Sequence, residues 1–187
     1  MKVRDSGMPE KDMWENFFNP DEVLTKLGLD NKINNVAEFG CGYGTFTIPA
    51  AKVIKGEIFA FDIEPNMIEM TQRRAIEQGL NNVKTILRDF VRDGSGLEDE
   101  SVDFVMLFNI LHAENPNKLL REAYRILKPE SILAIIHWNY DPKTPRGPAM
   151  EIRPKSEQCI EWAEDAGFYN SKKYKIAPYH YGIVLRK

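Results

Sequence analysis

Three glycines within five positions, directly after an apolar run, constrain this fold more than any other feature. They are Gly40, Gly42 and Gly44 in the stretch VAEFGCGYGTFT, residues 36–47. Glycine at this density weakens both helices and strands, so the chain must need bare backbone there. A turn of this kind, between a buried strand and the start of a helix, is typical of a chain that passes directly under a bound ligand. The stretch therefore predicts a ligand site at this turn.

The rest of the chain alternates short apolar runs with helical patterns of about 10 to 15 residues. That alternation predicts an α/β fold, with a mostly parallel sheet of seven strands, helices on both faces and a closing antiparallel hairpin. Ligands of such sheets bind beyond the carboxyl ends of the strands, where the glycine turn lies. Strands are expected at residues 35–39, 57–63, 83–90, 102–110 and 131–138 and as two runs within 172–187, and helices at 44–54, 65–79, 115–129 and 156–168.

Length and composition fit a globular protein. The chain has 187 residues, which suits one domain, and its net charge of −3 gives no general attraction for nucleic acid. Its two cysteines are too few for a disulfide scaffold or a four-cysteine zinc site. No signal peptide and no run of about 18 apolar residues is present, so we expect a cytoplasmic protein without a membrane span. We expect one domain over residues 1–187, with 1–30 as a helical cap or lid and 31–187 as the core.

Acidic side chains are expected around the same edge of the sheet. Asp62 ends the second strand, where it can accept hydrogen bonds from both hydroxyls of a ribose. Asp89 and Phe90 end the third strand, where a carboxylate and a backbone N–H can bind an adenine ring. Glu38 stands two residues before the first glycine, where its negative charge disfavours a pyrophosphate and suits a cofactor with a cationic end. S-adenosylmethionine, which carries an ammonium, a sulfonium, a ribose and an adenine, fits this pattern.

Taken together, these residues make the chain resemble the class I S-adenosylmethionine-dependent methyltransferases over about residues 30 to 187. EFGCGYG matches their E/D-x-G-x-G-x-G motif, AFDIEPNMIEM their acidic second-strand motif and RDF their adenine motif. VDFVMLFNILH and LLREAYRILKPESILAII match the small-molecule branch, which includes the ubiquinone and menaquinone C-methyltransferases. One departure is the turn Lys128-Pro129-Glu130-Ser131, where the family reads K-P-G-G.

The resemblance implies a Rossmann-like three-layer sandwich with strand order 3-2-1-4-5-7-6 and an antiparallel seventh strand. It also implies a transferase that uses S-adenosylmethionine and releases S-adenosylhomocysteine. Asn109 is then expected beside the methionine part of the cofactor, and Ile63 and Met67 against the adenine. The expected cofactor-binding residues are Glu38, Gly40, Cys41, Gly42, Gly44, Asp62, Ile63, Met67, Asp89, Phe90 and Asn109.

The methyl acceptor is expected to be a small molecule rather than a nucleic acid. The N-P-P-Y-type motif of amino-directed enzymes is absent after the fourth strand, where NILH stands. No metal is expected, because Asn109 and His137 occupy the strand ends at which catechol-type enzymes place metal-binding aspartates. No catalytic residue is assigned, but His112 and Tyr140 are candidates. The candidates for acceptor binding are Trp14, Phe17, Phe18, His112, His137, Tyr140, Arg146 and Arg153.

Two other functions remain open from the residues alone. A nicotinamide-dependent oxidoreductase would use the same kind of sheet, but its G-x-G-x-x-G fingerprint needs a glycine where this chain has Thr45. A non-catalytic S-adenosylmethionine-binding protein is the second alternative, since no obligatory base is evident. Cofactor preference separates the first from a methyltransferase, and turnover separates the second.

Overall fold

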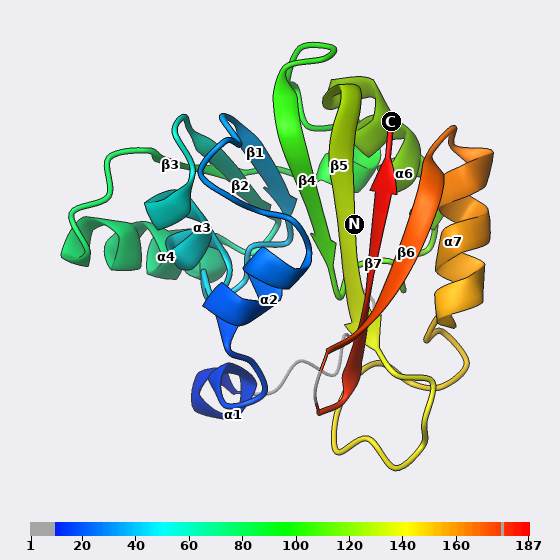
Figure 1. The fold of residues 1–187 in the computed structure, drawn as a ribbon. Helices are drawn as coiled ribbons and strands as arrows, with labels where there is room; N and C mark the ends of the chain where they lie inside the picture. The colour runs from blue at the N-terminus through cyan, green and yellow to red at the C-terminus, as the bar shows by residue number, and fades with distance from the viewer. Residues whose placement is uncertain (1–9, 177) are drawn as a thin grey trace.

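A single seven-stranded sheet forms the centre of the protein in the computed structural model, which describes residues 10–176 and 178–187 (Figure 1). The strand order is β3-β2-β1-β4-β5-β7-β6, with β7 antiparallel to both of its neighbours and the other pairs parallel. This confirms the predicted sheet order and the antiparallel seventh strand. The strands are β1 Val36–Phe39, β2 Ile58–Asp62, β3 Val83–Leu87, β4 Val102–Phe108, β5 Leu127–Trp138, β6 Tyr169–Ile176 and β7 His180–Arg186.

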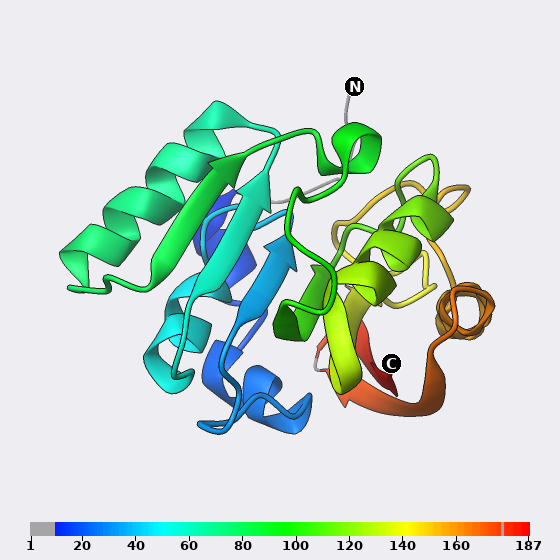
Figure 2. The ribbon, with the colours of Figure 1, turned by 90° about the horizontal axis from the view of Figure 1, so that it is seen from above.

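Helices lie on both sides of this sheet and make the predicted three layers (Figure 2). Helices α1 Lys11–Glu15, α2 Pro20–Lys26, α3 Thr47–Val53 and α4 Pro65–Glu77 lie on one side, and α5 Phe90–Asp93, α6 Pro116–Ile126 and α7 Ser156–Asp165 on the other. Helices α2, α4 and α6 each begin with a proline, whose fixed φ suits the first helical position. Between the sheet and the helices on each side lies a separate cluster of buried apolar side chains.

Several element boundaries differ from the predicted ones, each for a local reason. Helix α3 begins at Thr47 rather than residue 44, because the glycine turn runs on to that point. Strand β3 ends at Leu87, and the short helix α5, which periodicity did not reveal, follows it. Asp89 caps α5 by accepting a hydrogen bond from the Arg92 backbone N–H at 3.0 Å. The carboxylate that was expected to meet adenine thus also starts a helix.

The turn that departs from K-P-G-G is absorbed into strand β5, which follows α6 without a break. Glu130 has φ +63°, in the left-handed region that favours glycine. Its backbone N–H donates to the Lys187 carbonyl at 2.8 Å, and its carbonyl accepts from the Arg186 side chain at 2.7 Å. Its carboxylate accepts from the Tyr169 hydroxyl at 2.7 Å. These contacts hold a non-glycine residue in a conformation that costs about 1 kcal/mol or more.

The lysine-rich C-terminal hairpin forms the edge of the sheet, with β6 outermost. Lys173 pairs with Glu157 of α7 at 2.6 Å, and Lys187 pairs with Glu100 at 3.3 Å. Lysines on an edge strand oppose pairing with a second sheet, which gives this basic cluster a structural role. Within residues 10–176 and 178–187, no helix is both long enough and apolar enough to cross a membrane.

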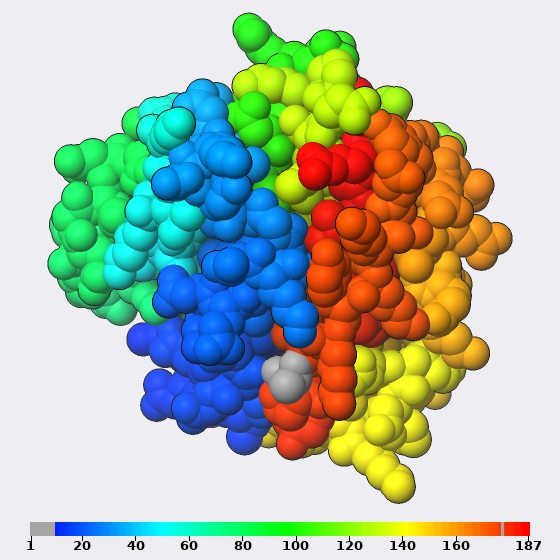
Figure 3. Space-filling view, in the orientation of Figure 1, coloured from blue at the N-terminus to red at the C-terminus, as the bar shows by residue number. Residues whose placement is uncertain are grey.

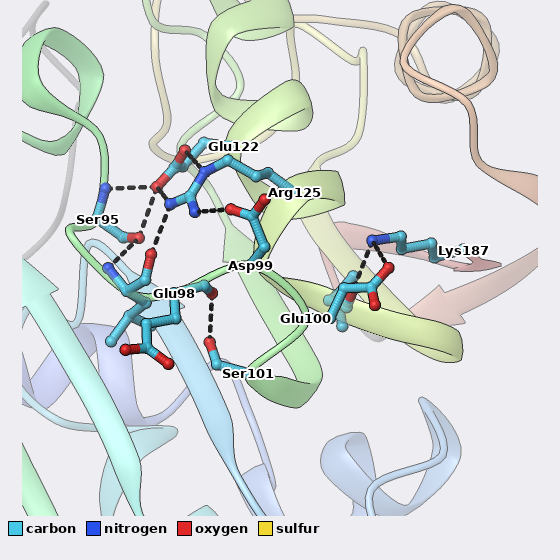
Figure 4. A network of polar contacts seen from close by, with 10 residues as sticks. Ser95, Glu98, Asp99, Glu100, Ser101, Glu122, Arg125 and Lys187 are labelled. Atoms are coloured by element: carbon cyan, nitrogen blue, oxygen red, sulfur yellow. Dashed lines mark hydrogen bonds and ion pairs between the residues drawn. The ribbon is translucent and has the colours of Figure 1, made fainter.

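A polar network ties the loop before β4 to helix α6 (Figure 4). One carboxylate oxygen of Glu122 accepts from the Ser95 backbone N–H at 2.7 Å and from the Ser95 hydroxyl at 2.6 Å. Arg125 donates to both Glu122 oxygens, at 2.7 and 2.9 Å, and to the Leu97 carbonyl at 2.8 Å. Burial alone would raise the pKa of Glu122, but the hydrogen bonds from Arg125 and Ser95 outweigh it and lower the pKa to about 2.

We expect Glu122→Gln to destabilise the fold by about 1–2 kcal/mol at pH 7, after allowance for solvent screening of Arg125. Because the folded pKa lies below the unfolded value, this stabilisation is present above about pH 4.5 and is lost as the pH falls toward 2. Urea unfolding at a series of pH values measures it. Glu100→Gln, in an exposed pair, is the control, and a difference between variant and wild type that did not change with pH would contradict the assignment.

Candidate functional site

The glycine turn leaves β1 at the carboxyl edge of the sheet, next to the end of β2. The backbone N–H groups of Gly40 and Cys41 both donate to the Phe61 carbonyl, at 2.8 and 2.9 Å. Gly42 and Gly44 have φ +53° and +74°, where any other residue is strained. The backbone path itself therefore demands glycine at these positions.

Helix α4 supplies a second reason for bare backbone in this turn. A Cβ on Gly44 would lie 3.0 Å from the Thr71 hydroxyl oxygen, which is too close for an ordinary contact. The same hydroxyl donates to the Gly42 carbonyl at 3.0 Å. Close packing on α4, which the sequence pattern did not reveal, thus contributes to the glycine requirement.

Asp62 holds the turn from the end of β2. One of its carboxylate oxygens accepts from the Gly42 backbone N–H at 2.9 Å, and the other accepts from Ile63 and Glu64 at 2.8 and 3.0 Å. Burial raises the pKa of Asp62, while these three backbone donors oppose the rise. The strand end and the glycine turn are therefore fixed to one carboxylate.

Glu38 lies on β1 beneath the turn and is only 2% exposed. Its carboxylate accepts a hydrogen bond from the Thr47 hydroxyl, at the start of α3. Burial raises its pKa to about 8; the Thr47 hydrogen bond opposes the rise, and the nearby charge of Asp62 adds to it. A carboxyl group whose pKa is raised in this way ionises more readily when a cation lies beside it.

The other expected cofactor residues surround the turn at different depths. Ile63, Met67 and Asp89 are partly buried, so their side chains have some access to the surface. The Phe90 ring is buried and packs edge-on against Phe39 at 5.3 Å, which gives the side chain a core position. The Cys41 thiol is also buried, and burial raises its pKa, as expected for an unreactive side chain.

Asn109 follows β4 directly and has φ +54°. Its backbone N–H donates to the Ile136 carbonyl at 2.7 Å, but both polar atoms of its side chain are buried with no hydrogen-bond partner among the described residues. Buried polar groups normally have partners, so an amide in this state points to a ligand or an ordered water. Other buried polar atoms in the same condition belong to side chains at the same edge of the sheet, namely Thr45, Asn117, His137 and His180.

Three histidines gather where β4, β5 and β7 meet this edge, on the two faces of the sheet. His112, in the turn after β4, lies edge-on to His137 of β5, with ring centroids 5.6 Å apart. His180, which opens β7 and which the sequence reasoning missed, lies on the other face against Trp138, with centroids 4.2 Å apart. Burial lowers the pKa of His180 to about 3 and that of His137 well below its usual value. Among the described residues, no cluster of His, Cys, Asp or Glu could hold a metal ion.

The N-terminal segment lies beside the C-terminal hairpin, as the blue and orange-red surfaces show (Figure 3). Its aromatic residues pack together and against that hairpin. The Trp14 ring lies 4.8 Å from Phe18 and 6.2 Å from Trp138, and Phe17 lies 5.4 Å from Tyr179. Met13, which lies in the same short helix as Trp14, is 45% exposed. In this structure the three aromatic candidates form a packed wall beside the strand ends.

The proline-rich segment after β5 is organised by Arg153. Its guanidinium donates to the carbonyls of Pro148, Asn139, Asp141 and Arg146 and to the Thr144 hydroxyl, and its side chain is buried. These contacts differ from the predicted acceptor binding by Arg153, because its donors are turned toward the loop itself. Arg146 is exposed, and Tyr140 is 47% exposed with the Lys155 ammonium 4.9 Å from its ring centroid.

Known proteins share both the sequence and this architecture. The chain is 26% identical over 170 residues to 2-methyl-6-phytyl-1,4-hydroquinone methyltransferase 1 of Oryza sativa subsp. japonica, covering 89% of this chain and 50% of that protein. It is 31% identical over 118 residues to a demethylmenaquinone methyltransferase of Listeria monocytogenes, covering 59% of this chain and 47% of that protein. The chain thus spans about half the length of these curated relatives.

A solved structure described as a SAM dependent methyltransferase from Aquifex aeolicus superposes with a TM-score of 0.82 at 27% identity, covering 94% of this chain and 93% of that one. The family described as a methyltransferase domain matches residues 30–176, which is most of the chain and includes the glycine turn, Asp62 and Asn109. That match shows that this protein belongs to the methyltransferase domain family.

Proposed function

We propose that this protein is an S-adenosylmethionine-dependent methyltransferase that acts on a small phenol or hydroquinone. The observation that carries the proposal is the sheet edge where the glycine turn and the Asp62 carboxylate lie near Asn109, whose side-chain amide has no hydrogen-bond partner among the described residues. When bound, S-adenosylmethionine supplies an electrophilic methyl group. The protein would hold the two reactants in line and exclude water. The family match favours this activity over nicotinamide chemistry, for which Thr45 also replaces a required glycine.

Asp62 would accept hydrogen bonds from the ribose hydroxyls while its backbone contacts keep it in place. We expect Asp62→Asn to weaken S-adenosylhomocysteine binding at least tenfold, because charge-assisted hydrogen bonds contribute about 1.5–3 kcal/mol each. Isothermal titration calorimetry measures the affinity, and circular dichroism checks that the variant is folded. Glu64→Gln, the exposed neighbour, is the control. If the affinity fell by less than about twofold, Asp62 would only stabilise the glycine turn and would not bind the ribose.

Glu38 would stabilise the cationic amino acid end of the cofactor from beneath the turn. Without ligand its raised pKa means that wild-type stability falls as the pH rises from about 4.5 to 8. We expect Glu38→Gln, which cannot ionise, to gain about 2–4 kcal/mol relative to wild type across that window. The same variant should bind S-adenosylhomocysteine about tenfold more weakly.

Urea unfolding at pH 5 and pH 8 tests the first effect, and calorimetry tests the second. Glu57→Gln removes an exposed carboxylate that pairs with Lys84 and serves as the control. If Glu38→Gln were instead destabilised at pH 8, the glutamate would be an ionised and stabilising group in the ligand-free protein. That result would contradict the assignment.

The proposed acceptor follows from the named relatives and from the aromatic side chains at the strand ends. Those relatives are named for a phytyl hydroquinone and a demethylmenaquinone, both of which are quinone-type rings. Trp14, Phe17 and Trp138 supply the apolar faces against which such a ring packs favourably. A phenol or hydroquinone acceptor must lose a proton as it is methylated on oxygen or on the ring, so a base near β4 and β5 has a purpose.

We propose His112 as that base in preference to Tyr140. His112 is buried in the turn that follows β4, which also contains Asn109, whereas Tyr140 is 47% exposed. His137 packs against the His112 ring and stays neutral, so it fixes the ring without adding a positive charge. We expect His112→Gln to lower kcat about a hundredfold with little change in S-adenosylhomocysteine affinity. Tyr140→Phe should change kcat by less than about twofold. Equal losses in the two variants would contradict this assignment.

The decisive experiment supplies methyl-labelled S-adenosylmethionine and a panel of phenols, hydroquinones and naphthoquinols, with aliphatic alcohols and amines as comparison. Label transfer to an aromatic acceptor is the expected result. Binding of S-adenosylhomocysteine without any turnover would favour a non-catalytic binding protein. Binding of a nicotinamide cofactor in its place would overturn the proposal.

A further inference from the structure

Helix α4 presents one polar stripe to the glycine turn. Thr71 and Arg74 share this stripe, at the i, i+3 spacing that places helical side chains on one face. The Thr71 hydroxyl donates to the Gly42 carbonyl at 3.0 Å, and Arg74 Nη1 donates to the Tyr43 carbonyl at 2.6 Å. Two consecutive carbonyls of the turn are therefore fixed by neighbouring positions of α4.

Arg74 also reaches beyond the turn. Its Nη1 lies 2.8 Å from Oε1 of Glu15, the last residue of α1, and the two side chains are 25% and 33% exposed. The preceding residue, Trp14, is buried against Trp138 at the end of β5 and His180 at the start of β7. Helix α1 is thus linked to the glycine turn indirectly, through Glu15 and Arg74, and it contacts the ends of β5 and β7 through Trp14.

Helix α1 depends on these contacts because it has only five residues, too few for a helix to be stable alone. It has no side-chain cap at its N-terminus. Its position is therefore set by the Trp14 packing on one side and by Arg74 on the other. Because the Arg74 guanidinium contacts both the Tyr43 carbonyl in the turn and Glu15 in α1, a turn that becomes more rigid also restricts the motion of α1.

We propose that Arg74 is a positioning residue that couples the seating of α1 to cofactor binding at the glycine turn. This inference rests on the proposed function, in which S-adenosylmethionine binds at that turn. A ligand that orders the Tyr43 carbonyl orders Arg74, and Arg74 then holds Glu15 and the aromatic wall beside the acceptor. Because coupling between two sites is reciprocal, a seated α1 also favours the bound state of the cofactor turn.

The test compares Arg74→Met, which keeps the aliphatic stem, with Arg73→Met on the same helix. Arg73 is 69% exposed and, among residues 10–176 and 178–187, makes only a long pair with Glu77 at 3.9 Å. Its replacement therefore controls for the change in helix propensity and in net charge. Hydrogen exchange followed by mass spectrometry over residues 10–18 reports on α1, with and without saturating S-adenosylhomocysteine. In the ligand-free state we expect Arg74→Met to speed exchange there about fivefold and Arg73→Met to leave it unchanged.

With ligand bound, the wild-type protein should exchange at least tenfold more slowly over residues 10–18. Arg74→Met should keep less than a third of that protection. The variant should also bind S-adenosylhomocysteine about fivefold more weakly than the wild type does. Arg74→Lys, which retains the charge but lacks the fork, should recover part of the ligand-free protection. Equal ligand protection in Arg74→Met and wild type would overturn the coupling. If wild type bound no S-adenosylhomocysteine, the proposed function would fail, whereas the ligand-free comparison would still decide whether Arg74 seats α1.

Discussion

The carboxylate of Asp62 is the interaction on which the proposed site depends. It ends β2, accepts a hydrogen bond from Gly42 in the turn that follows β1, and accepts two more from the residues after it. Two strand ends and the glycine turn therefore share one anchor. Because the turn passes through positive φ values that only glycine adopts freely, it needs such an anchor to hold one shape. The path of the backbone toward α3 follows from that shape.

This edge of the sheet also contains buried polar atoms that lack hydrogen-bond partners among the described residues, which lowers the stability of the ligand-free protein. The side chains of Asn109 and His137 are buried at the same edge of the sheet with no hydrogen-bond partner in the described part of the chain. An unsatisfied buried group costs about 1–3 kcal/mol. Buried polar groups are normally hydrogen-bonded, so their concentration at the carboxyl edge supports the proposed ligand site there.

The proposed acceptor side is built differently from the proposed cofactor side. Its parts are held by long-range packing rather than by one turn: α1 is fixed by aromatic contacts and Arg74, and the segment after β5 is fixed by Arg153. Loops held in this way can change in sequence without changing the sheet beneath them. This separation fits a family in which one scaffold presents a common cofactor edge and a variable acceptor edge.

The sequence by itself determined the α/β class with a mostly parallel seven-stranded sheet, and the glycine turn that leads to Asp62 at its carboxyl edge. These could be predicted because hydrophobic periodicity, glycine spacing and strand-end residues are local signals, and parallel strands bring their carboxyl ends to one edge. The resemblance to a known family then added the strand order, the expectation for Asn109 and the identity of the cofactor.

Only the tertiary structure decided which side chains are turned toward the site and which are used to build it. Arg153 and Arg74 look alike in the sequence, yet one closes a loop and the other joins a helix to the glycine turn. Likewise, His180 lies far along the chain from Trp14, and only the antiparallel β7 returns it to the same edge. Such roles depend on contacts between distant segments, on burial and on the direction of a single side chain. None of these has a local pattern in the chain.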